Sequence, residues 1–114
     1  MQSAYYKGKC LKRKLSKCKD VCRTYSEIGD KYALKLEEND DILEIRCNAP
    51  LEGLSIGEYL SDFVCKRRNG DLMVRECVQR KHLTKPMTLK LLDASREYWI
   101  RHGVVDWGVV IDEE

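Results

Sequence analysis

The segment of residues 58–79 constrains the fold of this chain most strongly. Two alternating runs, "EYLSDFVCK" and "DLMVRECVQ", flank the stretch "RRNG". The Asn69-Gly70 pair favours a tight turn between antiparallel strands, because both residues tolerate the positive φ angles that such turns require. The segment therefore predicts a β-hairpin, and the other elements are placed around it.

Helical and strand-like patterns alternate in the rest of the chain. Apolar residues recur at helical spacing from Tyr25 to about Glu38, and "DILEIRC" then alternates as a strand does. The stretch "NAPLEGLSIG" contains one proline and two glycines, which indicates a loop. Pro86 begins a helix that runs to about His102, and Gly103 ends it. Last comes "VVDWGVVI", which is nearly continuous in apolar residues, as in a strand covered on both faces.

The order αβββαβ predicts one α/β domain with a mixed central sheet flanked by helices. A length of 114 residues suits a single domain, and 43% hydrophobic with 35% charged residues argues against disorder and membrane residence. No apolar run approaches the roughly 20 residues of a membrane span, and the N-terminus has no apolar signal core. These features predict a cytoplasmic protein whose six cysteines are thiols.

The cysteines are also candidates for a structural zinc site. Cys10, Cys18 and Cys22 cluster near the N-terminus, but they are not paired as Cys-x2-Cys and no fourth ligand is near them in sequence. His82 and His102 lie far away along the chain. The spacing therefore favours small buried or half-buried thiols over a metal site.

Positive charge is concentrated at the N-terminus. Residues 1–24 hold eight basic residues against Asp20 alone, a balance of +7, so the remainder of this +2 chain carries −5. We interpret residues 1–24 as a basic arm and residues 25–114 as the folded domain. A basic arm can bind DNA phosphates by releasing counterions, although a solvated charged segment has the same composition. The candidate DNA contacts are Lys7, Lys9, Lys12, Arg13, Lys14, Lys17 and Lys19.

Two carboxylates of the predicted hairpin stand among residues that are apolar on the same face of their strands. Alternation places Asp62 and Glu76 on adjacent strands with core-like neighbours, where an unpaired carboxylate is costly. Together with the backbone carbonyl of Cys77, they could bind Mg²⁺ or Mn²⁺ through oxygen. Alternatively, the row faces solvent at that end, or a nearby cation neutralises the acids. The candidate cations are Arg75, Arg80 and Lys81.

The phrases "SDFVCKRRNGDLMVRECV" and "REYWIRHGVVDWGVVID", with the order of elements, resemble the N-terminal domain of the TnsA transposon endonucleases. The resemblance covers about residues 20 to 112 and implies the PD-(D/E)xK restriction-endonuclease-like fold. The family pattern Pro-Asp-Phe-(Leu/Val) corresponds to residues 61–64, with Ser61 for proline, and Glu-x-Lys corresponds to residues 76–78. Such enzymes cut DNA at transposon ends with Mg²⁺, paired with a second transposase subunit.

The chain departs from this family at two site positions. Val78 stands where the family has lysine, and Gly29 where it has a glutamate on the first helix, with Glu27 and Asp30 as imperfect substitutes. A relocated positive charge could come from Arg80, in the row of Glu76, or from Lys31, although arginine is a poor general acid or base.

These departures favour a weakened or inactive site. We therefore expect a TnsA-like protein of a mobile element or phage that binds DNA or a protein partner. That partner would be a transposase subunit or a host defence complex, with the protein acting as an accessory factor or an inhibitor of a defence nuclease. The alternative is an active Mg²⁺-dependent DNA endonuclease in which Asp62, Glu76 and Arg80 are catalytic. In that case Asp62, Glu76 and Cys77 would hold Mg²⁺ or Mn²⁺.

Overall fold

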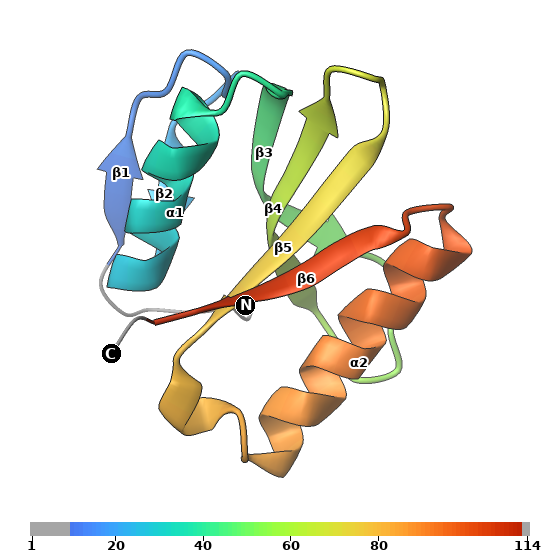
Figure 1. Ribbon diagram of the computed structural model, residues 1–114. Coiled ribbons are helices and arrows are strands. Elements are labelled where there is room, and N and C mark those ends of the chain that lie inside the picture. The colour runs from blue at the N-terminus through green and yellow to red at the C-terminus, as the bar shows by residue number, and fades with distance from the viewer. Residues whose placement is uncertain (1–9, 113–114) are drawn as a thin grey trace.

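A four-stranded mixed sheet forms the centre of the molecule (Figure 1). The computed structural model describes residues 10–112. Strands β3 (Ile42–Leu51), β4 (Tyr59–Arg67) and β5 (Leu72–Val78) pair antiparallel, and β6 (Asp106–Ile111) pairs parallel to β5. The sheet order is β3-β4-β5-β6, so β3 and β6 are its edges. The predicted α/β domain with a mixed central sheet is confirmed.

Helices cover opposite faces of this sheet (Figure 1). On one face lie α1 (Glu27–Glu38) and a small two-stranded sheet of β1 (Leu11–Arg13) and β2 (Cys22–Thr24). On the other face lies α2 (Pro86–Arg101). A short 3-10 helix, η1 (Arg80–His82), follows β5. Within the described residues, neither long helix is long and apolar enough to cross a membrane.

Local sequence signals explain where the helices begin and end. The Ser26 hydroxyl caps α1 by accepting the Gly29 backbone N–H at 3.1 Å, which satisfies one of the free amides of the first turn. Pro86 occupies the first turn of α2, where its missing N–H costs nothing. Gly103 follows α2 with a φ of 82°, a left-handed conformation that glycine adopts without steric cost.

The sheet separates two apolar cores. The core under α1 contains Leu36, Phe63 and Cys65, and the core under α2 contains Val64, Val74 and Trp99. Adjacent residues of β4 thus serve different cores, as the alternation of side chains in a strand requires.

The alternation of side chains between the two faces of the sheet is interrupted where the neighbouring strands β3 and β4 are both kinked. On β4, Phe63 packs into the core under α1, yet Ser61, two residues away, points to the α2 side and contacts Glu76. The same change of face occurs on β3 around Asn48, whose φ of 55° is left-handed. Asp62 lies opposite Asn48 at this kink, between the paired positions on either side. A prediction of faces by period-two counting therefore fails at Asp62.

Three elements differ from the sequence prediction. Strand β3 continues through Pro50 to Leu51, where a loop is predicted; proline is tolerated there because β3 is an edge strand that lacks a partner on one side. Strand β6 is only half-buried, with Val109 37% exposed, so it is not covered on both faces as predicted; it forms the other edge of the sheet. The described part of the basic arm, residues 10–24, forms β1 and β2 and places Leu15 and Cys22 in the core under α1.

Candidate functional site

Glu76 lies at the centre of a buried hydrogen-bond network between the sheet and α2. Its side chain is 0% exposed. One carboxylate oxygen, Oε2, accepts from the hydroxyls of Ser95 at 2.6 Å, Tyr59 at 2.8 Å and Ser61 at 2.9 Å. The other oxygen, Oε1, accepts the backbone N–H of Asp62 at 2.7 Å. Four donors from β4 and α2 therefore converge on one carboxylate of β5.

Two tryptophans fix the direction of these hydrogen bonds. The indole N–H of Trp99 donates to Ser61 Oγ at 3.0 Å, and that of Trp107 donates to Ser95 Oγ at 3.1 Å. An indole nitrogen can only donate. Each serine oxygen therefore accepts from a tryptophan and uses its own hydrogen to donate to Glu76.

Burial and hydrogen bonding act in opposite directions on Glu76. Burial raises the pKa of the Glu76 carboxyl above its ordinary value, while the hydrogen bonds from Ser95, Tyr59 and Ser61 oppose that rise. Burial also raises the pKa of the Tyr59 phenol above its usual range, so this group remains protonated and can donate. Neutral donors rather than cations thus compensate for the buried acid.

Three of the four candidate cations contact acids other than Asp62 and Glu76. Arg75 Nη2 donates to Asp106 at 2.7 Å, on the α1 side of β5. Arg80 is not on the strand: it lies in η1, and its backbone N–H and guanidinium contact Asp112. Lys31 forms an exposed ion pair with Glu27 at 3.1 Å. Lys81 is exposed in η1.

Asp62 is half-buried beside Glu76 and bridges β4 to β5. Its Oδ2 accepts the backbone N–H of Cys77 at 2.7 Å, while its own N–H donates to Glu76. These bonds take the place of ladder pairing, which between β4 and β5 extends only as far as Phe63 and Arg75. The three residues are thus neighbours, but their contacts run through the backbone N–H groups of Asp62 and Cys77, and not through converging carboxylates and the Cys77 carbonyl.

A cavity of about 10 Å³ adjoins Asp62 at the N-terminus of α1. Asp62, Cys77, Gly29 and Thr24 are among its lining residues, and the buried Thr24 hydroxyl has no hydrogen-bond partner among the described groups. This volume suits one water molecule. Burial raises the pKa of the Cys77 thiol to about 12, so that thiol remains protonated beside the cavity.

The two family positions that depart from TnsA are both closely packed. Val78 is 5% exposed at the end of β5. A Cβ atom on Gly29 would lie 3.3 Å from Cβ of Thr24, which is tighter than ordinary van der Waals contact. The position at which the resemblance predicts a glutamate therefore holds a glycine packed against Thr24 of β2.

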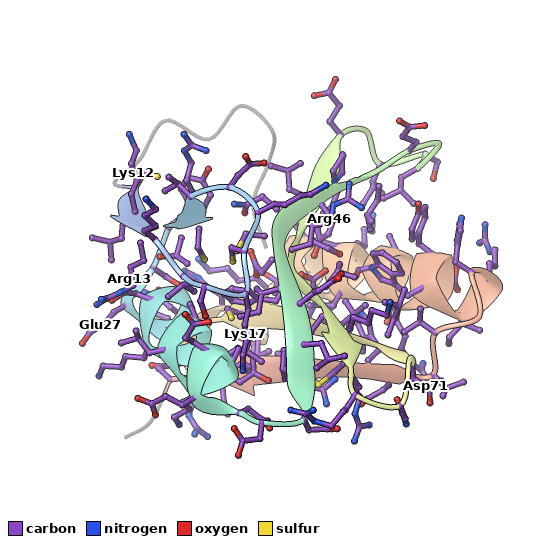
Figure 2. All side chains as sticks on the ribbon, turned by 90° about the horizontal axis from the view of Figure 1, so that it is seen from above. Lys12, Arg13, Lys17, Glu27, Arg46 and Asp71 are labelled. Carbon is purple, nitrogen blue, oxygen red and sulfur yellow. The ribbon has the colours of Figure 1, made fainter. Side chains whose placement is uncertain are left out.

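A groove of about 840 Å³ runs along β3. Lys17, Lys19, Arg46 and Lys66 line it, against only two acids, Asp20 and Glu44. Figure 2 shows Lys17 and Arg46 beside β3, with Lys12 and Arg13 on the β1–β2 side. The groove also exposes Val21, Leu43 and Leu72.

The predicted basic contacts are not equivalent. Arg13 forms an ion pair with Asp30 at 2.6 Å, and Lys17 Nζ donates to the carbonyls of Leu36 and Asn39 at the end of α1. Lys12, Lys14 and Lys19 are exposed. Lys7 and Lys9 lie outside the described residues.

Sequence reasoning identified the acids but missed the residues that hold them. The partners of Glu76 are polar or amphipathic residues at positions of the strands and of α2 whose neighbours on the same face are apolar. That pattern is the signal by which the sequence could have indicated them. These partners are Tyr59, Ser61, Ser95, Trp99 and Trp107.

Comparisons with protein families and with curated proteins find no match to this chain. The resemblance to TnsA therefore stays a prediction.

Proposed function

We propose that this protein is a DNA-binding domain, related in architecture to the TnsA endonucleases, that binds the DNA backbone without cleaving it. The observation that carries the proposal is the groove along β3, which is lined by four basic residues and only two acids. Three of the four, Lys19, Arg46 and Lys66, are exposed, while the ammonium group of Lys17 binds carbonyls at the end of α1. Basic side chains gathered in a concave surface bind phosphates and release counterions. Such contacts position a protein on DNA but do not read its sequence.

Three segments contribute to this basic surface. Lys19 comes from the loop between β1 and β2, Arg46 from β3, and Lys66 from β4, and all three are exposed. Hydrogen bonds hold the loop in place: Glu37 of α1 accepts from the backbone N–H groups of Ser16 and Lys17 at 2.6 and 3.2 Å. The basic groups are thus presented from a fixed framework, which reduces the entropy lost on binding.

The environment of Glu76 argues against hydrolysis. A metal ion needs carboxylate oxygens with free lone pairs, whereas the described donors already supply four hydrogen bonds to this carboxylate. Val78, in place of the family lysine, is apolar and buried. Asp62 is the acid that adjoins a cavity, so the alternative of an active Mg²⁺-dependent endonuclease would have to begin there.

Salt-dependent binding to duplex DNA tests the proposal. We expect the logarithm of the binding constant of the wild-type protein to fall linearly with the logarithm of salt concentration, as counterion release requires. Arg46→Glu combined with Lys66→Glu should weaken binding on the order of tenfold or more and reduce this slope. Lys90→Glu combined with Arg96→Glu, on the exposed surface of α2 and outside the groove, reverses the same number of charges and should change binding little.

Two outcomes contradict the proposal. Absence of DNA binding, or equal weakening by Lys90→Glu combined with Arg96→Glu, would show that the groove does not bind DNA. The exposed Val21, Leu43 and Leu72 in the same groove would then favour a protein partner.

Nicking of supercoiled DNA with Mn²⁺ tests whether the domain also cleaves. We expect none from the wild-type protein or from Asp62→Asn, which keeps an oxygen to accept the Cys77 N–H. Nicking by the wild type that Asp62→Asn abolishes would establish the endonuclease alternative.

A further inference from the structure

Three cysteines that are far apart in the sequence meet between the small sheet and β3. Cys18 lies in the loop before β2, Cys22 begins β2, and Cys47 lies in the middle of β3. Their sulfur atoms all lie within 4.8 Å of one another. The sequence places only Cys18 and Cys22 near each other, and the fold supplies the third sulfur.

The sulfur atoms of Cys22 and Cys47 lie 2.7 Å apart, within hydrogen-bonding distance. A thiol hydrogen bond needs only two sulfurs, yet the fold brings the third, from Cys18, within 4.8 Å of both. A disulfide would hold two of the sulfurs at about 2.05 Å and leave Cys18 beside it unused. A shared cation explains why three sulfurs converge rather than two.

We propose that Cys18, Cys22 and Cys47 form a binding site for a thiophilic divalent cation of the Zn²⁺ class. Zinc binds thiolates at about 2.3 Å, which sets neighbouring sulfurs about 3.8 Å apart in a tetrahedral site. A side-chain movement of about 1 Å between Cys22 and Cys47 achieves that spacing. Soft sulfur ligands select Zn²⁺ over Mg²⁺ or Ca²⁺, so this site is distinct from any oxygen site at Asp62.

Hydrogen bonds outside the cluster hold the three cysteine-bearing segments in register. The Ile45 backbone N–H donates to the Lys17 carbonyl at 2.9 Å, which ties the Cys18 loop to β3. The Asn48 side-chain amide donates to the Arg23 carbonyl at 2.8 Å, which ties β2 to β3 beside Cys22 and Cys47. The ligand-bearing backbone is therefore arranged before the metal binds, so little ordering is required.

The site opens on the basic groove. Cys22 is 1% exposed, but Cys18 and Cys47 are half-buried and line the groove wall. Three protein sulfurs and one open position give a four-coordinate zinc, with water or an exchangeable ligand in the fourth place. A metal here joins the β1–β2 sheet to β3 and so fixes the segment that carries Lys19.

Metal stoichiometry on the full chain tests the site. Protein purified with a reductant is mixed with Zn²⁺, freed of excess metal and weighed by native mass spectrometry. We expect one zinc ion per chain in the wild type and in Cys10→Ser, whose cysteine lies outside the cluster, and none in Cys18→Ser or Cys47→Ser. Co²⁺ should give the sulfur charge-transfer absorption of a thiolate site in the wild type, and the two cluster variants should lose it.

Circular dichroism establishes that the variants are folded. Cys18→Ser and Cys47→Ser alter half-buried positions, so the comparison does not depend on Cys22→Ser, which alters a fully packed one. The proposal is overturned if the wild type retains no zinc, if the cluster variants retain as much as the wild type, or if the reduced protein still carries a Cys22–Cys47 disulfide, detected as the loss of two hydrogens in its mass.

Discussion

The Ser95 hydroxyl of α2 donates to the Glu76 carboxylate of β5 at 2.6 Å, and neither side chain is exposed to solvent. Ser95 also accepts the indole N–H of Trp107 on β6. One serine thus connects the helix, the central strand and the edge strand. The two hydrogen bonds run in one direction, from Trp107 to Ser95 and from Ser95 to Glu76. The Glu76 carboxylate is therefore the final acceptor on which the packing of α2 depends.

Replacing Glu76 by glutamine should destabilise the fold although the shape is kept. An amide nitrogen in place of Oε1 would set two N–H donors against the Asp62 N–H, whereas a protonated carboxyl carries only one O–H. We expect the free energy of unfolding to fall by about 2–4 kcal/mol, measured by urea denaturation. Glu97→Gln, at an exposed glutamate of α2, is the control and should have little effect. An unchanged stability of Glu76→Gln would contradict the network.

Replacing Ser95 by alanine should remove two hydrogen bonds at once. Glu76 loses a donor and the Trp107 indole loses its acceptor. We expect a loss of about 1–3 kcal/mol in the free energy of unfolding, since both groups stay away from water. Ser55→Ala, in the exposed loop after β3, serves as the comparison. Trp107 fluorescence should also change only in Ser95→Ala, because only that substitution alters the indole's partner.

The hairpin and α2 could be predicted because their signals are local. Asn69-Gly70 sets the turn between β4 and β5, and Pro86 and Gly103 bound α2 within one residue of the prediction. The network around Glu76 could not be predicted, since it depends on which serine of α2 lies over β5. Nor could the position of Cys47 beside Cys22 be predicted, because it depends on how β2 meets β3.

The pKa of Glu76 predicts a fall in stability as pH rises. Burial raises this pKa in the folded state above the ordinary value of 4.5, so the folded protein holds the proton more tightly than the unfolded chain. The free energy of unfolding should therefore decrease as pH rises from 4.5 to the raised pKa, and level off above it. The difference between wild type and Glu76→Gln, measured by urea denaturation across this range, isolates the effect. If the wild type instead gains stability over Glu76→Gln as pH rises, the hydrogen bonds to the ionised carboxylate outweigh the cost of burying its charge.

The ion pair between Arg13 and Asp30 predicts the opposite pH dependence. The hydrogen bond from the Arg13 guanidinium lowers the pKa of the Asp30 carboxyl below its ordinary value. Its contribution to stability is present above the unfolded pKa and is lost as pH falls through the folded one. Arg13→Gln should raise the Asp30 pKa toward its ordinary value in an NMR titration, while Lys14→Gln should leave it unchanged. Equal pKa values in wild type and Arg13→Gln would mean that β1 is not held to α1 by this pair.

Placing a lysine at position 78, where the resemblance to TnsA predicts one, should not create a nuclease. Val78 is 5% exposed at the end of β5, so Val78→Lys buries an ammonium group where the described network around Glu76 is already satisfied by neutral donors. We expect a loss of about 2 kcal/mol or more in the free energy of unfolding and no Mn²⁺-dependent nicking. Val109→Lys, at a position of β6 that is 37% exposed, is the matched control and should cost less stability. Nicking by Val78→Lys that Asp62→Asn then abolishes would show that the carboxylates can still hold a metal, and that the missing lysine alone keeps this domain from cleaving DNA.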